Sequence, residues 1–157
     1  MRILKLIGFI LACEILGSIG SLATAPAIRG WYQTLVKSPL NPPNWVFGPV
    51  WTLLFALMGI ALFWVWEKGL KKKPVKEALI YFGLQFTANI IWSFLFFGAK
   101  LPGMAFADII ILWLLILATI IKFYRISKPA GLILIPYLLW VSFASFLNWS
   151  VVILNHF

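Results

Sequence analysis

Aromatic rings, amides and small residues recur at helical spacing in three stretches of this sequence, and these side chains could recognise a ligand. Residues three, four or seven positions apart fall on one face of a helix. The first stretch carries Phe47, Trp51, Phe55 and Gly59; the second carries Phe82, Gln85, Asn89, Trp92 and Phe96; the third carries Trp140, Ala144 and Asn148. Each stretch therefore presents one stripe of rings mixed with small or hydrogen-bonding residues.

If the three stripes face one another, they line a flat and mostly apolar pocket with a few hydrogen-bonding groups. Such a pocket suits a planar aromatic or sterol-like ligand. The alternative is that the amides bond across helices and the rings simply pack, as is common in membrane bundles. Trp64, Trp66 and Trp149 fall outside the stripes and suit the aromatic belts found at membrane interfaces.

Side chains for acid–base or metal chemistry are few. There is one histidine, His156, and one cysteine, Cys13, so no intramolecular disulfide or cysteine-based metal site can form. No hydrolase, nucleotide-binding or metal-ligand motif is present. The four acidic residues are scattered along the chain: Glu14, Glu67, Glu77 and Asp108. The sequence therefore disfavours a hydrolase or a metalloenzyme, and no metal site is predicted.

The composition indicates what surrounds these side chains. Of the 157 residues, 63% are hydrophobic and 11% are charged, whereas a soluble domain is roughly half apolar and about one quarter charged. So few polar groups could not cover a soluble fold of this kind. The sequence predicts an all-α integral membrane protein that forms one domain over residues 1–157.

Five segments are long and apolar enough to cross a bilayer as helices, which takes about 20 residues. They are residues 4–25, 46–66, 78–97, 104–123 and 130–154. The first ends at Pro26 and resembles a cleavable signal peptide, but Glu14 interrupts it and four more segments follow, so we expect it to be retained. Pro136 predicts a kink in the fifth. The result is a bundle of five transmembrane helices.

The connection over residues 26–45 is the only long one. It is aromatic and rich in proline, which is typical of a lid over a site, although an interfacial anchor explains the same residues equally well. Asp108, near the start of the fourth segment, could latch this loop by pairing with Arg29 or Lys37. The simpler explanation for Asp108 is that a helix N-terminus favours a carboxylate.

The net charge of +9 indicates orientation rather than nucleic-acid binding, because the basic residues lie between the apolar segments. One side collects Arg2, Lys5, Lys68, Lys71, Lys72, Lys73, Lys76, Lys122, Arg125 and Lys128, ten in all; the other has Arg29, Lys37 and Lys100, three in all. Basic residues favour the cytoplasmic side. We therefore expect a cytoplasmic N-terminus, with the 26–45 loop and the C-terminus facing outward.

Small residues at four-residue spacing permit close approach of helices. Gly17, Ser21 and Ala25 form such a face on the first segment, and Gly83 and Thr87 form a shorter one on the third. Either face could mediate a homodimer. Glu14 lies in the middle of the first segment, where it is paired within the bundle, protonated, or exposed to lipid.

Three blocks of the sequence follow the pattern of a known family. They are WYQTLVKSPLNPPNWVFGPVWTLLFALMGIA, then ANIIWSFLFFGAK with AFAD after it, and PYLLWVSFASFLN. In these blocks the chain resembles the translocator protein family, which is also known as the tryptophan-rich sensory protein or peripheral benzodiazepine receptor family. The similarity runs from about residue 31 to residue 148.

The resemblance implies a five-helix bundle, commonly a homodimer, that binds porphyrins such as protoporphyrin IX and haem. It also implies binding of sterols in animals and of synthetic isoquinoline carboxamide and benzodiazepine ligands, with no cofactor required. Carried over by position, the implied ligand-binding residues are Tyr32, Trp51, Phe55, Asn89, Trp140, Ala144 and Asn148. Tyr32 belongs to the loop that covers the pocket in the family.

Two departures from the family pattern matter. Met104 stands where animal members have a tryptophan before the fourth-segment motif, which puts one aromatic wall of the pocket in doubt. The tail FLNWSVVILNHF lacks the Tyr and Lys or Arg of the proposed cholesterol motif, which is a weak pattern even when present. A bacterial plasma-membrane protein is therefore expected.

These observations favour a membrane binding protein for porphyrin-type tetrapyrroles that acts as a sensor or carrier. A second hypothesis is enzymatic: light- or oxygen-dependent degradation of bound porphyrin, with the indoles of Trp51 and Trp140 as candidate electron donors. A third is an alternating-access transporter of porphyrin or sterol-like molecules. The five segments cannot divide into two equal halves, which weakens the third hypothesis.

Overall fold

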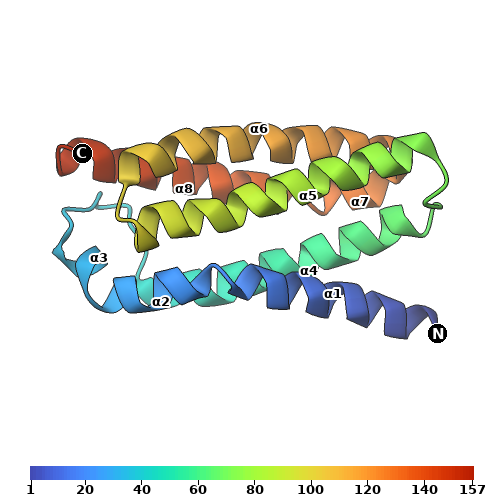
Figure 1. Ribbon diagram of the computed structural model, residues 1–157, viewed down its shortest axis with the longest axis horizontal. Helices are drawn as coiled ribbons and strands as arrows, with labels where there is room; N and C mark the ends of the chain where they lie inside the picture. The colour runs from blue at the N-terminus through green and yellow to red at the C-terminus, as the bar shows by residue number, and fades with distance from the viewer.

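The structure is a computed structural model that describes residues 1–157 and is built from helices, with no strand. Figure 1 shows the long helices running side by side, with the two termini at opposite ends of the molecule. The helices are α1 (Arg2–Ser18), α2 (Ser21–Arg29), α3 (Trp31–Thr34), α4 (Phe47–Trp66), α5 (Lys73–Ser93), α6 (Pro102–Ile126), α7 (Lys128–Leu132) and α8 (Ile135–Leu154). A 3₁₀ turn, Asn44–Val46, leads into α4, and a π-helical turn, η2 (Phe94–Gly98), extends α5.

Four stretches of helix are long and apolar enough to cross a membrane: Asn44–Trp66, Lys73–Gly98, Pro102–Ile126 and Lys128–Leu154. The pair α1 and α2 passes the same test together but bends by 47°, so it makes a fifth span if it crosses as one broken helix. This confirms the predicted all-α membrane class.

The first span, predicted as one helix over residues 4–25, is bent. It breaks after Ser18, and α2 then continues through Pro26 to Arg29. At the break the hydroxyl of Ser18 donates to the carbonyl oxygen of Ile15, and that of Ser21 donates to the carbonyl oxygen of Ser18. Hydroxyls that bond to backbone carbonyls in this way bend membrane helices, and such helices also tolerate an internal proline.

Prolines also explain where the other spans begin. Pro74 and Pro102 lie in the first turns of α5 and α6, which start earlier than the predicted residues 78 and 104. The last span, for which Pro136 predicted a kink, is interrupted just before that residue. Helix α7 ends at Leu132, and Pro136 lies in the first turn of α8, where its missing N–H costs no helical bond.

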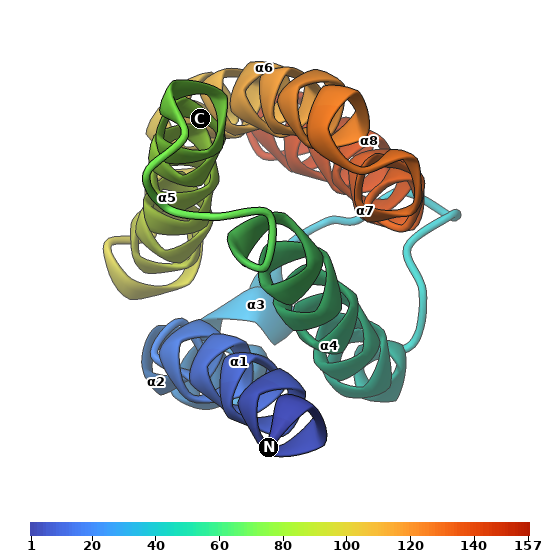
Figure 2. The ribbon, with the colours of Figure 1, turned by 90° about the vertical axis from the view of Figure 1, so that its right-hand side faces the viewer.

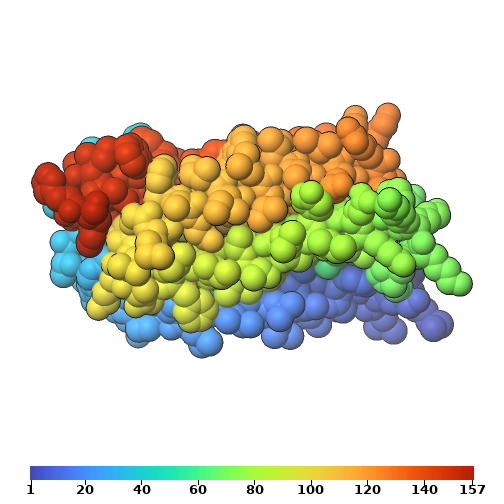
Figure 3. All heavy atoms as spheres, turned by 45° about the horizontal axis from the view of Figure 1, so that its top comes forward, coloured from blue at the N-terminus to red at the C-terminus, as the bar shows by residue number.

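Close packing of α1 against α4 depends on Gly59. A Cβ atom at this position would lie 2.6 Å from Cα of Ile10 on α1, so only glycine permits this approach. Viewed along the bundle, α1 and α4 form one group and α5, α6 and α8 form another (Figure 2). Along one face of the molecule α5 and α6 lie side by side (Figure 3).

Two ion pairs join helices at the end of the bundle that carries most of the basic residues. Arg2 Nε donates to Glu67 Oε1 at 2.8 Å, which links the start of α1 to the end of α4. Lys122 on α6 lies 3.4 Å from Glu77 on α5. The hydrogen bond from Arg2 lowers the pKa of Glu67 below its usual value.

Candidate functional site

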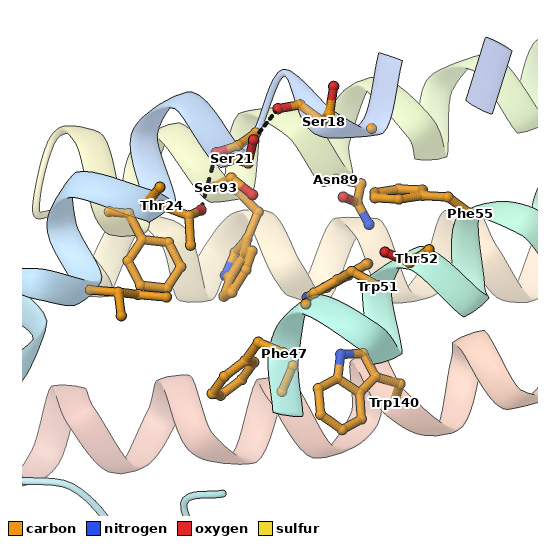
Figure 4. A pocket seen from close by; sticks show the side chains of 18 of the residues that line it. Ser18, Ser21, Thr24, Phe47, Trp51, Thr52, Phe55, Asn89, Ser93 and Trp140 are labelled. Atoms are coloured by element: carbon orange, nitrogen blue, oxygen red, sulfur yellow. Dashed lines mark hydrogen bonds between the residues drawn. The ribbon is translucent and has the colours of Figure 1, made fainter. Parts of the chain in front are cut away.

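A cavity of about 410 Å³ lies between the bent first span and helices α4, α5 and α8. Figure 4 shows its two sides: hydroxyl side chains of the first span face aromatic rings of α4 and α8. The rings of Trp51 and Phe55 stack at 5.5 Å between centroids, and Phe47 meets Trp140 edge-on at 6.0 Å. The predicted stripe of α4 therefore forms one wall, and α8 adds Trp140 and Ala144.

The indole N–H of Trp140 is buried and has no hydrogen-bond partner within the chain. Its nitrogen edge points toward Trp51 on the same side of the cavity (Figure 4). A buried donor without a partner costs about 1–3 kcal/mol. A ligand carrying an acceptor atom would remove that cost.

Asn89 lines the cavity from α5 and is held in a buried chain of hydrogen bonds. Its Nδ2 donates to the hydroxyl oxygen of Tyr137 at 2.8 Å, and that hydroxyl donates to Oε1 of Gln85 at 2.8 Å. Gln85, which shares the predicted stripe, does not line the cavity. It fixes Tyr137 instead, so the amide of Asn89 is presented in one orientation.

Asn148 does not line the main cavity, and its ligand-binding role stays a prediction. Its Oδ1 accepts the indole N–H of Trp92 at 3.0 Å, and its Nδ2 donates to the carbonyl oxygen of Pro102 at 2.9 Å. Both ends of the amide are therefore used to join α5, α6 and α8. Asn148 and Tyr32 border a second cavity of only about 30 Å³, which adjoins the first through Phe47, Trp92, Phe97 and Ala144.

The long loop is fastened to the last helix by Asn155. The side chain of Asn155 accepts the backbone N–H of Val36 and donates to the carbonyl oxygen of the same residue, both at 2.9 Å. This is the pattern that a neighbouring peptide group would make. The loop is also bonded internally, because the hydroxyl of Tyr32 donates to Oδ1 of Asn41 at 2.9 Å. Burial raises the pKa of Tyr32, which keeps this hydroxyl protonated as a donor.

The predicted latch between Asp108 and Arg29 is not formed in this structure. Neither residue takes part in an ion pair, and Oδ2 of Asp108 is buried without a partner. Lys37, the alternative partner, donates to the carbonyl oxygens of Tyr32 and Leu35. The loop thus satisfies its cation with its own backbone, and Asp108 lines neither of the two cavities.

The small-residue face of the first span borders the cavity. A Cβ atom on Gly17 would lie 2.5 Å from the ring of Phe55, so this glycine makes room for an aromatic ring of the same chain. Ser21 and Ala25 line the cavity as well. The face on α5 remains open, since a Cβ on Gly83 would meet nothing within 4 Å.

Sequence reasoning missed the contribution of the first span. Glu14 lines the cavity, and its side chain forms no ion pair within the chain. Ser18 and Thr24 of the same span also line the cavity. Four-residue spacing of small residues is the signal that the sequence offers, and it indicates close helix packing as readily as a cavity wall. Met104, which stands where animal members of the family have a tryptophan, is 59% exposed and lines neither cavity. Its substitution for tryptophan therefore removes no aromatic wall from either cavity.

No group of three or more His, Cys, Asp or Glu side chains lies close enough to hold a metal ion. The cavity offers three indoles, those of Trp51, Trp92 and Trp140, with amide, hydroxyl and carboxyl groups around them. It can stack a planar ring system and hydrogen-bond its edges.

The fold and the cavity define a multi-pass membrane protein with an internal site lined by tryptophan. The chain belongs to the TspO/MBR family, whose model matches residues 9–154. It is similar to the tryptophan-rich protein TspO of Chlorobaculum tepidum, at 46% identity over 91% of this chain and 90% of that protein. The translocator protein of Bos taurus is 34% identical over 92% of this chain and 86% of its own length. The tryptophan-rich sensory protein of Cereibacter sphaeroides is 33% identical over 94% of this chain and 89% of its own length.

Proposed function

We propose that this protein binds porphyrin-type tetrapyrroles, with protoporphyrin IX and haem as examples, and acts as a membrane sensor or carrier for them. The observation that carries the proposal is the cavity itself, in which two indoles lie on one wall and the amide of Asn89 adjoins them. Flat aromatic ligands stack on such rings, and the few polar groups fix their orientation. The same cavity suits isoquinoline carboxamide and benzodiazepine-type ligands.

A titration with protoporphyrin IX tests the proposal. The purified protein is titrated in the dark, and tryptophan fluorescence and the porphyrin absorption band are followed together. Binding at the cavity should quench the fluorescence, and Trp51→Phe and Trp140→Phe should each reduce the quenching. Trp149→Phe is the matched control, because Trp149 is 46% exposed and lies outside the cavity. Quenching that is unchanged in both cavity variants would contradict the assignment.

The indoles of Trp51 and Trp140 in the cavity also support a second candidate, photo-oxidative degradation of the bound porphyrin. Indoles next to a photo-excited ring can donate electrons or trap reactive oxygen. Illumination at saturating porphyrin should then give a new absorbing product in the wild type that Trp51→Phe and Trp140→Phe largely lose. Binding without such a product excludes the enzymatic function and leaves the sensor or carrier function.

A third candidate is alternating-access transport of porphyrin or sterol-like molecules. A measurement of ligand flux across a membrane distinguishes transport from binding alone. Protein in sealed liposomes should move protoporphyrin IX to the far side faster than empty liposomes if it transports. Equal rates with intact binding would exclude transport.

We further propose the plasma membrane of a bacterium as the location, with a cytoplasmic N-terminus. The support is the ten-to-three bias of basic residues between the two ends of the bundle. Five spans place the termini on opposite sides, as their positions in Figure 1 allow. A reporter that is active only outside the cytoplasm should work when fused after Phe157 and fail when fused before Met1. The reverse pattern would overturn the orientation.

A further inference from the structure

The two sides of the cavity differ in the hydrogen-bonding groups that they offer. On the first span, the hydroxyls of Ser18, Ser21 and Thr24 each donate their proton to a backbone carbonyl of the same span. Figure 4 shows them together on one side. Having used their protons, these hydroxyls can only accept hydrogen bonds from a ligand. The opposite wall holds the free indole N–H of Trp140, which can only donate.

Glu14 completes the accepting wall at its deep end. It is the one charged side chain among the twenty residues that line the cavity, and no basic group of the chain pairs with it. It lies twelve residues after Arg2, which places it about 18 Å along α1 and near the middle of the membrane. The cavity extends from there toward Ile28 and Asn44 at the loop end.

A carboxyl group at that depth constrains what can lie beside it. An ionised carboxylate in a low-dielectric site requires a positive charge or strong donors nearby, and it repels a second carboxylate. A neutral carboxyl still accepts through its carbonyl oxygen. An ionised Glu14 therefore favours a ligand that brings N–H donors or a cation to the deep end, whereas a neutral Glu14 can also donate through its hydroxyl.

We propose that Glu14 and the hydroxyls of the first span form an acceptor wall that selects and orients ligands by their N–H or ammonium groups. The ligand class is a planar, mostly apolar molecule with such donors along one edge and an acceptor on the opposite edge for Trp140. This inference rests on the proposed function and refines it. Beside an ionised Glu14, a porphyrin with two propionates on one edge should place that edge toward the 26–45 loop.

Three ring-matched probes test the acceptor wall: protoporphyrin IX, its neutral dimethyl ester, and its bis(2-aminoethyl) amide, which carries two ammonium groups. Affinities are measured by tryptophan quenching for the wild type, Glu14→Gln and Glu14→Asp. Asp108→Asn is the matched control, because it removes an intramembrane carboxyl that lines neither cavity.

We expect Glu14→Gln to weaken binding of the diamine by about tenfold or more, since a charge-assisted hydrogen bond is lost. The same change should alter binding of the ester by less than about threefold, a small free-energy difference. Glu14→Asp should keep the preference for the diamine, and Asp108→Asn should change nothing. Equal effects of Glu14→Gln on all three probes, or no effect on any, would overturn the acceptor wall while leaving porphyrin binding intact. If no probe quenches the wild type, the proposed function and this inference both fall.

Discussion

At the scale of single residues, helical spacing located the aromatic wall of the cavity but not the side that the first span contributes. Trp51, Phe55, Asn89 and Trp140 line the cavity because spacing along a helix determines which side chains share a face. That they bind a ligand stays a prediction. Asn148 also shares its face with Trp140, but its partners, Trp92 and Pro102, come from other helices that the spacing does not register.

Ala144 gives the sharpest test at this scale, since it lines both cavities where they adjoin. Ala144→Leu should weaken porphyrin binding by roughly tenfold or more, because filling a packed site costs about 1–3 kcal/mol. Both indoles remain in place, so the affinity reports obstruction alone. Ala107→Leu on the exposed side of α6 is the control and should bind normally. A wild-type affinity in Ala144→Leu would place the ligand elsewhere.

At the scale of elements, the existence of the spans followed from apolar length, whereas the break in the first one did not. Ser18 and Ser21 read equally well as small packing residues or as hydroxyls that bond to carbonyls, and only the folded backbone distinguishes the two. The loop was expected to be held by charge. It is held by the amide of Asn155, because an amide can pair with both groups of one peptide unit.

Asn155→Ala should therefore loosen the loop and speed release of a bound porphyrin. Two hydrogen bonds are lost, each worth about 0.5–1.5 kcal/mol, so the dissociation rate should rise severalfold to tenfold or more. Stopped-flow dilution of the complex measures it. Asp108→Asn should leave the rate unchanged, because Asp108 forms no ion pair. Faster porphyrin release from Asp108→Asn than from Asn155→Ala would instead support the ionic latch between Asp108 and the loop.

The ion pair between Arg2 and Glu67 predicts a pH dependence of the packing between α1 and α4. The folded pKa of Glu67 is lowered, so its contribution is present above the unfolded pKa of about 4.3 and is lost as pH falls through the folded value. Thermal unfolding in detergent should show a small advantage of the wild type over Glu67→Gln at neutral pH. The advantage should shrink in high salt and disappear in strong acid. An advantage that grows on acidification would contradict the assignment.

At the scale of the whole molecule, α5 carries the small-residue face that remains open to a second copy. Gly83→Leu should reduce the dimer fraction in detergent, because a large side chain keeps two helices apart. Gly8→Leu is the matched control, since a Cβ on Gly8 also meets nothing within 4 Å but lies on α1. Cross-linking or light scattering measures the fraction. If Gly8→Leu dissociates the dimer and Gly83→Leu does not, the interface lies on α1.

The bend in the first span determines which ligand concentration sets the occupancy of the cavity. Past Ser18 the chain no longer packs against α4, and α2 packs against η2 and α3 instead. Two residues on opposite sides of the cavity, Ser21 and Thr52, are both exposed. An opening between two membrane spans faces acyl chains. An apolar ligand then reaches the site from its solution in the lipid, so its mole fraction in the bilayer sets occupancy. Apparent dissociation constants expressed per litre of buffer should rise in proportion as more lipid or detergent is added at fixed protein.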